Sequence, residues 1–503
     1  MAARRVLISS CILFLIGATA WSQQPRLTIY NQNFAVIRVQ TPLDLKQGVN
    51  NVQVSDVTAF LEPDSVILRD PSGQYPLRIL EQNYRADPVT QSRMLQLYEG
   101  QEINFLVVRD GQSQVVRGKI IRSGYAPPNP FPYPQLYGGQ PQYSPGGNEP
   151  IIEVNGQLQF SLPGQPLFPA LAEDSILKPI LSWVIESPKA GHVNADLSYV
   201  TQGMNWEATY NVIERGANQS LNLLGWVTIH NRSGMTFENA SVKLMAGTVN
   251  KITPQYGGVI GGVPGGVPGG VLGALRLPLV TQKPFDEYHL YTLHRPVTLR
   301  DQETKQVEFI RADGIQSSLY YVYDGLKIPQ NQYNGWSMQM IRQNSEFGTE
   351  SNHAVRVMRE FANTQANHLG IPLPAGRLRF YRQDQDGNLE FLGESEIPHT
   401  PENENVNVYT GNSFDLTGDR RRTNYAIDNL RRTLDEAFEI RLRNHKPQPV
   451  EIRVDEHLYR GDTWEIVQHS NVFVKMDSHT IEFRVQVPPN GEKVLTYTVH
   501  YTW

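Results

Sequence analysis

The chain has 503 residues, of which 19% are charged and 40% hydrophobic, and its formal net charge is −5. This slight acidic excess leaves no basic surface of the kind that binds nucleic acid. The length allows about two or three domains, and the many Pro, Gly and Tyr residues suit short strands and turns better than helical bundles. We therefore expect an all-β, multidomain protein that does not bind nucleic acid.

Residues 1–22 have the features of a bacterial secretory signal peptide. Arg4 and Arg5 form a basic start, residues 6–16 form an apolar core too short to cross a bilayer, and residues 17–20 offer small side chains for cleavage. An uncleaved anchor is the alternative. Cleavage near Ala20 or Ser22 predicts a secreted mature protein, periplasmic or extracellular, with no transmembrane span.

The single cysteine, Cys11, lies inside this apolar core. Residues 8–11 superficially match a lipidation site, but the apolar run continues to Ile16, whereas a lipidation site should end it. We expect cleavage to remove Cys11 and to leave a protein without a disulfide, a cysteine nucleophile or a cysteine metal ligand.

Residues 26–124 predict a separate N-terminal β unit, because apolar and polar residues alternate between tight turns. Its second half suggests either a small barrel or a plain three-strand meander. Residues 125–150 are rich in Pro and Gly and predict a linker, with a partner-binding polyproline segment as the alternative. A hairpin follows, with its turn at Asn155 and Gly156.

Residues 151–503 predict one long β region, and the stretch 197–247 carries its clearest pattern. There apolar side chains recur at every second position between turns, which indicates consecutive antiparallel strands with one face buried in a sandwich. Ile180 to Glu186 predict a strand of the same sheet, because Pro179 would interrupt a helix. The Gly-Val-Pro repeats of residues 256–275 predict a low-complexity insert without a packed core.

Further strands are expected through the C-terminal half. Residues 353–364 favour a strand, and two strands flank a turn at 384–388. Residues 423–439 have helical propensity, but we expect a strand at each end and at most a short helix between them. The last four predicted strands have the spacing of an immunoglobulin-like sandwich.

Several phrases of this sequence resemble the bacterial domain of unknown function 4139 family. They are Y-x-T-x-G-x-x-W-x-A-x-Y from Tyr199, an N-x-[ST]-G turn at Asn231 and N-A-x-[VL]-x-L at Asn239, followed in order by segments at 287–309, 371–401, 438–446, 457–466 and 487–503. The resemblance covers about residues 197–503. It implies an all-β, extracytoplasmic protein. The family has no assigned activity, so the resemblance assigns no catalytic residue to this sequence. Some relatives are labelled mucoidy inhibitors, which points to the cell envelope.

No metal-binding motif stands out in the sequence. His289 and His294 are five residues apart on a predicted strand and should face opposite sides, which favours a structural role. Residues 384–387 (Asp-Gln-Asp-Gly) resemble the start of a calcium loop but lack the later ligands, so a hairpin turn explains them better.

Motifs for covalent or acid–base catalysis are equally weak. Ser175 and Lys178 have the S-x-x-K spacing without its companion motifs, and Pro179 would disrupt the helix that such a serine needs. Glu394 and Glu396 share one face of a strand, whereas Asp455 and Glu456 are adjacent and should point to opposite faces. Both pairs are more typical of solvated strand faces than of the paired carboxylates of a glycoside hydrolase. Aromatic side chains exposed on a sheet can form a platform for carbohydrate, and the tryptophans that suggest one are Trp206, Trp226, Trp336 and Trp464. On alternating strands, however, we expect most of these aromatic residues to lie in the core.

The sequence thus predicts no catalytic, cofactor-binding or metal-ligating residue and no cofactor. The function that we expect is a non-enzymatic binding or scaffolding role in the cell envelope, with an envelope polysaccharide or an envelope protein as partner. The alternative is a polysaccharide hydrolase whose carboxylates converge only in three dimensions. A weaker reading is assembly through open sheet edges.

Overall fold

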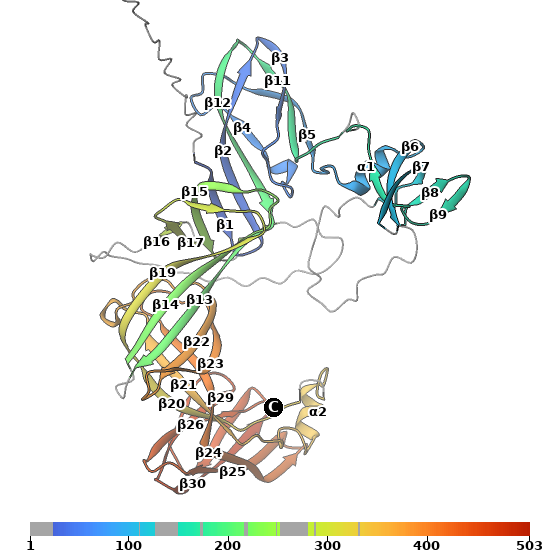
Figure 1. The fold of residues 1–503 in the computed structure, drawn as a ribbon. Helices are drawn as coiled ribbons and strands as arrows, with labels where there is room; N and C mark the ends of the chain where they lie inside the picture. Colours follow the sequence, from blue (N-terminus) through green and yellow to red (C-terminus); the bar gives the residue numbers. More distant parts are fainter. Residues whose placement is uncertain are drawn as a thin grey trace, which may run out of the picture. The chain divides into compact units, whose positions relative to one another are not determined.

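The computed structural model describes residues 24–109, 111–125, 149–171, 175–215, 220–247, 249–251, 280–285, 288–329 and 332–503. The signal peptide expected at 1–22, the insert at 256–275 and most of the linker at 125–150 lie outside these residues. As predicted, the fold is mostly β, built from several open sheets (Figure 1). Among the described strands no sheet closes, so the alternative of a small barrel in the N-terminal part is replaced by an open five-stranded sheet.

The chain divides into two compact units whose segments alternate along the sequence. Unit 1 comprises residues 1–205, 230–244 and 295–304, and unit 2 comprises residues 206–229, 245–294 and 305–503. The stretch 197–247 therefore contributes to both units. The predicted strands are present, but they are not neighbours in one sheet: β12 (Gly191–Gln202) belongs to unit 1, whereas most of β13 (Met204–Arg215) and β14 (Ser220–Asn231) belongs to unit 2.

The largest sheet of unit 1 joins the start of the chain to residues more than a hundred positions later. Its long central pair runs antiparallel from Phe34 opposite Gln202 to Leu45 opposite Gly191, so residues 26–124 do not close a unit by themselves. Leu27, Ile37 and Tyr199 fill its buried face. Within unit 1, the order of its strands is β15 (Phe237–Ala246), β1 (Arg26–Tyr30), β2 (Phe34–Leu45), β12 and β4 (Ile67–Arg69). The short strand β18 (Val297–Leu299) also pairs with β15.

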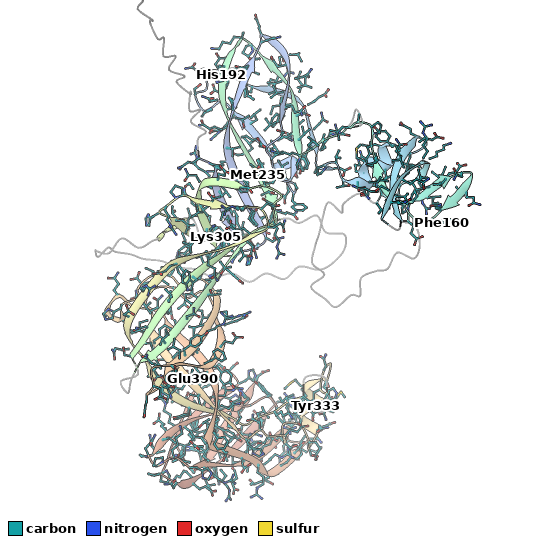
Figure 2. All side chains as sticks on the ribbon, viewed as in Figure 1. Phe160, His192, Met235, Lys305, Tyr333 and Glu390 are labelled. Atoms are coloured by element: carbon teal, nitrogen blue, oxygen red, sulfur yellow. The ribbon has the colours of Figure 1, made fainter. Side chains whose placement is uncertain are left out.

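Two smaller sheets complete unit 1. The strand predicted from Ile180 is present, but it lies between β3 and β5 and not beside β12, because alternation predicts a strand and not its partner. In the other sheet Asn155 and Gly156 both have positive φ, as a tight hairpin turn requires, and Phe160 is exposed after β9 (Figure 2). The first sheet consists of β3 (Gly48–Val54), β11 (Ile180–Ser187) and β5 (Arg78–Arg85). The second consists of β10 (Gln165–Leu167), β6 (Glu102–Arg109), β7 (Gln112–Arg122), β8 (Ile151–Val154) and β9 (Gln157–Gln159). Helix α1 (Gln91–Leu97) packs on this second sheet.

Unit 2 contains a mixed five-stranded sheet and a β-hairpin. β13 runs parallel to β22, which starts at Gly376, and β22 runs antiparallel to β23. The predicted strands around the turn at 384–388 are β22 and β23. The order is β19 (Glu303–Gln316), β14, β13, β22 (Gly376–Gln383) and β23 (Leu389–Ile397), and the hairpin is β16 (Val280–Phe285) and β17 (Tyr288–Leu293).

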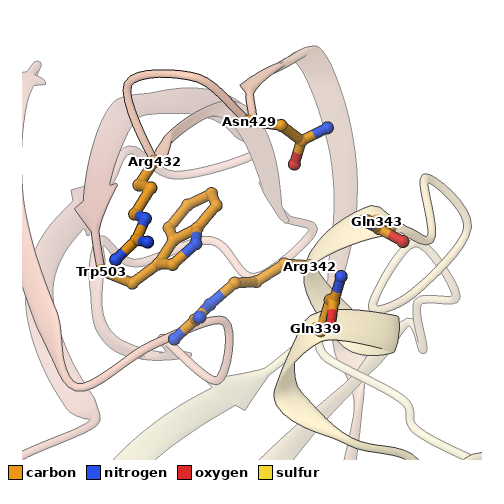
Figure 3. A pocket seen from close by; sticks show the side chains of 6 residues that line it. All are labelled: Gln339, Arg342, Gln343, Asn429, Arg432 and Trp503. Carbon is orange, nitrogen blue, oxygen red and sulfur yellow. The ribbon is translucent and has the colours of Figure 1, made fainter.

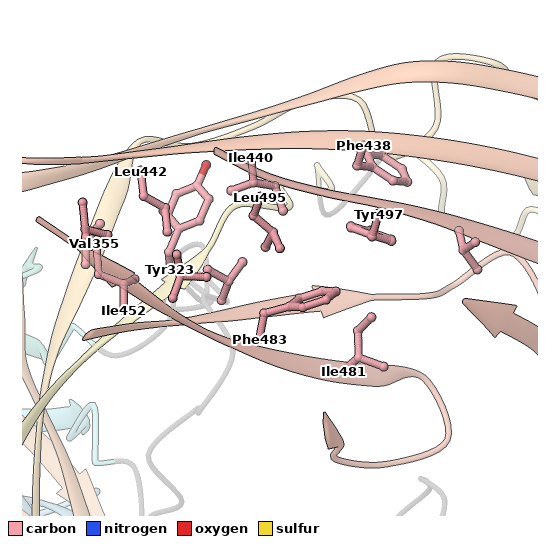
Figure 4. Packing of buried hydrophobic residues seen from close by; sticks show 14 of the residues in the cluster. Tyr323, Val355, Phe438, Ile440, Leu442, Ile452, Ile481, Phe483, Leu495 and Tyr497 are labelled. Carbon is pink, nitrogen blue, oxygen red and sulfur yellow. The ribbon is translucent and has the colours of Figure 1, made fainter. Parts of the chain in front are cut away.

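A nine-stranded sheet forms the rest of unit 2 and folds over onto itself. The rings of Phe438 and Phe483 both lie against Tyr497, with centroids 5.2 and 5.6 Å away, although their strands are not all neighbours in the sheet (Figure 4). These residues therefore fill a sandwich core. The order is β27 (Thr463–His469), β30 (Gly491–Thr502), β25 (Thr433–Asn444), β24 (Asn405–Asp428), β21 (Ala354–Ala362), β20 (Ser318–Asp324), β26 (Val450–His457), β29 (Thr480–Val487) and β28 (Phe473–Lys475).

Residues 423–439 contain no helix. They form the end of β24, a turn at 429–432 and the start of β25. Every second residue of β25 from Leu434 to Leu442 is buried, so the two-residue period of the core overrides the local helical propensity.

The same side-chain contact recurs at three strand ends. Asn231, Asn363 and Asn444 are fully buried, and each amide group donates to one carbonyl in its own loop and to two consecutive carbonyls in a second loop. A buried amide that is fully hydrogen-bonded fixes both loops. The accepting carbonyls are those of Met235, Leu299 and Arg300 for Asn231, of Ile371, Thr400 and Pro401 for Asn363, and of Gln448, Val487 and Pro488 for Asn444.

Candidate functional site

A polar pocket of about 540 Å³ opens at one end of the nine-stranded sheet (Figure 3). This volume lies in the range of small-molecule sites, roughly 300 to 1,000 Å³. Three segments distant in sequence supply its lining: helix α2 (Met338–Gln343), the turn at 429–432, and the residue that follows β30. The lining residues are Gln339, Arg342, Gln343, Asn429, Arg432 and Trp503.

The short helix α2 presents three of these side chains together. The hydroxyl of Ser337 caps its start by accepting from the backbone N–H of Met340. Arg342 and Gln343 lie three and four positions after Gln339, which places them on its face of the helix, and Figure 3 shows Arg342 reaching from α2 toward Trp503. The cap thus fixes the half of the pocket that α2 provides.

The buried guanidinium of Arg460 holds the other end of α2. It donates to the carbonyl oxygens of Ile341, Asn344 (2.9 Å) and Phe347 (2.8 Å), which satisfies carbonyls that a helix end leaves without partners. In return, Nε of Arg342 donates to the carbonyl of Arg460 at 2.8 Å. Outside the sheet, Tyr333 packs edge-on against Phe347 beside α2 (Figure 2).

Glu436 on β25 neutralises Arg460 inside the protein. Its carboxylate lies 3.0 Å from Arg460 and 3.2 Å from Arg422, and both Glu436 and Arg460 are almost completely buried. A buried carboxylate is tolerated when such partners surround it. Glu436 is therefore committed to structure, and its position on a core strand ties the pocket to the sandwich.

An indole ring and two guanidinium groups dominate the pocket itself. The guanidinium carbon of Arg342 lies 4.6 Å from the ring centroid of Trp503, a cation–π distance. Arg432 enters from the turn with φ +57°, a left-handed conformation that favours Gly or Asn. The lining contains three amide side chains and no Asp or Glu side chain.

A second cavity, of about 20 Å³, lies deeper in the same sandwich. This is enough for about one water molecule and too little for a sugar ring. Beside it, Nε of Arg420 donates to both oxygens of Glu456 at 2.9 Å, and the Tyr497 hydroxyl donates to the same carboxylate. Burial opposes the charge of Arg420, but Glu456 and Tyr497 raise its pKa above the usual range. This network is an internal support of the core.

A row of three carboxylates crosses the opposite face of the sheet. Asp324, Asp455 and Glu482 are direct neighbours on β20, β26 and β29. Burial, and then the charges of Glu482 and Asp324, raise the pKa of Asp455 to about 6. A hydrogen bond to Asp324 raises the pKa of His457. A raised acid pKa marks a candidate functional group, but neither cavity is lined by Asp455.

The residues that the sequence suggested for calcium binding and catalysis do not line the pocket. The Asp384 carboxylate accepts from the backbone of Asn388, as in a hairpin turn. Ser175 contacts the sulfur of Met94, whereas Lys178 pairs with Asp56 at 3.0 Å. Within the described residues, no group of three or more His, Cys, Asp or Glu side chains is placed to hold a metal ion.

The two carboxylate pairs have the strand geometry expected of them. Glu394 and Glu396 are both exposed, and Glu394 pairs with Arg379 at 3.3 Å. Glu456 points into the core, whereas Asp455 lies on the outer face. Neither pair lines a cavity.

The tryptophans divide between core and partial exposure. Trp206 is buried, whereas Trp226, Trp336 and Trp464 are half-buried and none lines the pocket. Sequence reasoning missed Trp503, Arg342 and Arg432. The available signals were the tryptophan after the last predicted strand and the arginine pair at 431–432 in a turn. Neither signal indicates that the two segments meet.

Fold and site together define an all-β protein with an open pocket of guanidinium, amide and indole groups. The chain belongs to the family with the domain of unknown function DUF4139, whose profile matches residues 195–503. A comparison with curated proteins finds no match. Among the described residues, no helix has the length and apolar composition needed to cross a bilayer.

Proposed function

We propose that this protein is an exported, non-catalytic component of the bacterial cell envelope that binds an envelope polysaccharide in the pocket at Trp503. The observation that carries the proposal is the pocket lining: one indole ring, three amides and two guanidinium groups. Aromatic faces suit the apolar face of a sugar ring, and amide side chains can both donate to and accept from hydroxyl groups.

The same lining argues against a hydrolase at this position. Glycoside hydrolysis usually uses two Asp or Glu carboxyl groups, about 5 to 10 Å apart, on either side of the scissile bond, and no Asp or Glu side chain lines the pocket. Glu436 and Glu456 lie nearby in the sandwich, but both are buried and paired with arginines. They have neither the access nor the free acid that the reaction requires.

Export is supported by residues 1–22, with their basic start, short apolar core and small residues before the expected cleavage point. Sequencing the N-terminus of the protein recovered from the producing bacterium tests this part of the proposal. We expect a chain that begins near residue 21 or 23 in the periplasmic or extracellular fraction. A full-length chain that begins at Met1 and stays in the cytoplasm would contradict export.

The binding test is a screen of the chain lacking residues 1–22 against envelope polysaccharides and cell-wall fractions. Trp503→Ala should abolish the binding of a polymer that the unaltered protein retains. Trp464→Ala is the matched control, because Trp464 is also half-buried, lies against Lys475 and does not line the pocket. Equal loss in both variants, or release of new reducing ends from the polymer, would count against the proposal.

A further inference from the structure

We propose that the pocket recognises a negatively charged sugar residue, whose carboxylate or sulfate oxygens bind Arg432 and Arg342. This inference rests on the proposed polysaccharide binding and specifies its chemistry. Arginine donates in a planar fork that matches such oxyanions. Neutral sugars would leave this fork without a charged partner.

Within the described residues, the two guanidinium groups of the pocket have no acidic side chain as a partner. The buried arginines of unit 2 have carboxylate partners: Arg359 lies 2.9 Å from Glu214, Arg420 2.9 Å from Glu456, and Arg460 3.0 Å from Glu436. In contrast, no ion pair joins Arg342 or Arg432 to an acidic side chain of the described chain. The pocket therefore presents two guanidinium groups that have no Asp or Glu partner.

Two internal contacts hold the side chain of Arg342 in place. Its Nε donates to the carbonyl of Arg460, and its guanidinium plane lies over Trp503. The side chain therefore extends from α2 toward Trp503, as Figure 3 shows. A fixed guanidinium loses less conformational entropy when it binds an anion.

Arg432 is held in place by the backbone of the turn. Its backbone carbonyl accepts from the N–H of Trp503 at 3.2 Å, which keeps the arginine next to the indole ring. Its left-handed φ of +57° is a conformation in which Asn or Gly would cost less. A long cationic side chain at such a position is a local departure from turn preference, as is often found at binding sites.

The amides and the indole favour a sugar over an acidic peptide. Gln339, Gln343 and Asn429 project separately around the opening and offer donors and acceptors for several hydroxyl groups. An extended peptide would instead use main-chain pairing along a sheet edge or alternate side-chain pockets. The charged group can come from a uronic acid or from a sulfate ester.

The test measures affinities of the chain lacking residues 1–22 by calorimetry. The probes are an oligogalacturonate, its methyl ester, a sulfated galactan fragment, a neutral galactan fragment and poly-glutamate. We expect one of the two charged saccharides to bind at least about tenfold more tightly than the methyl ester and the neutral fragment, with an affinity that falls as salt rises. The preferred charged saccharide identifies carboxylate or sulfate as the natural group.

Arg432→Gln should weaken this binding by about tenfold or more. Arg431→Gln is the matched control, because Arg431 is the adjacent residue, is exposed, lies 3.8 Å from Asp428 and does not line the pocket; it should change affinity by less than about twofold.

The outcomes separate the two proposals. Equal affinity for the acid, its ester and the neutral fragment, or no effect of Arg432→Gln, overturns the charge inference and leaves polysaccharide binding intact. Binding of poly-glutamate and of no saccharide overturns the assignment of a saccharide as the ligand. Binding of none of the probes overturns both the inference and the proposed function at this pocket.

Discussion

Arg432 combines an unfavourable backbone conformation with a place in the pocket. Arg432→Asn keeps a residue type that tolerates positive φ and removes the cationic side chain. We therefore expect the free energy of unfolding to stay the same or to rise by up to about 1 kcal/mol, while polysaccharide binding is lost. Urea denaturation and a binding assay on the same sample measure the two effects. A clear loss of stability would contradict our view that the arginine serves binding.

Asp455 makes the stability of the protein depend on pH. Its pKa in the folded protein, about 6, lies above the ordinary value of 3.8, so the folded state holds a proton more strongly than the unfolded state. Its contribution to stability is complete below about pH 4 and is lost as the pH rises through 6. His457, whose pKa is also raised, loses its contribution as the pH rises, whereas Asp324, whose pKa is lowered, loses its contribution in acid.

Asp455→Asn should therefore stabilise the protein at pH 7.5 by about 1 to 2 kcal/mol, after allowance for solvent screening of a partly exposed group. Because Glu482, His457 and Arg356 also face this position, their charges will shape the remaining profile. Denaturant unfolding from pH 4 to pH 8 measures the effect. Glu451→Gln, at an exposed position of the same strand, is the control and should leave the profile unchanged. A less stable Asp455→Asn protein at pH 7.5 would show that the carboxylate is a favourable charge.

At the scale of elements, α2 depends on a buried ion pair more than on its own sequence. Six residues are too few for a helix to be stable alone, and too few for hydrophobic periodicity to reveal it. The position of α2 is fixed by hydrogen bonds from Arg460, and the charge of Arg460 is balanced by the carboxylate of Glu436. The sequence shows both residues but does not show that they meet, because β25 and the loop after β26 come together only in the folded sandwich.

Glu436→Gln should leave Arg460 as a buried charge with weaker partners. We expect a destabilisation of about 3 to 5 kcal/mol and faster amide hydrogen exchange in residues 338–347 than elsewhere in the sandwich. The comparison is Glu439→Gln on the same strand, where the carboxylate pairs with Arg421 and Arg441 on the outer face and should contribute at most about 1 kcal/mol. Equal effects of the two substitutions would mean that Glu436 is not the anchor of α2.

At the scale of the whole molecule, alternation of apolar residues predicted most strands but not their partners. Leu197 and Trp206 lie nine residues apart in one predicted series, yet they belong to different sheets, because the chain turns at Gly203 with φ +81°. A Cβ atom at Gly203 would lie 2.6 Å from the carbonyl oxygen of Arg232, so this turn requires glycine. Pairing such as Phe34 with Gln202 depends on contacts that no local pattern encodes.

The pocket could not be predicted for the same reason. Its three segments are separated by roughly ninety and seventy residues, and each is locally ordinary: a short helix, a four-residue turn and the end of a strand. The repeated role of Asn231, Asn363 and Asn444 was equally hidden, since only the first lies in a recognisable turn motif. Sequence reasoning thus reached the fold class and the family, while the site required the folded chain.

Hydrogen–deuterium exchange on the chain lacking residues 1–22, with and without a bound envelope polysaccharide, tests most directly whether this sandwich binds its ligand at Trp503. We predict slower exchange in residues 338–347, in the turn at 429–432 and at the end of β30, with the polymer length unchanged. Protection confined to other strands, or a polymer shortened during the experiment, would contradict that result.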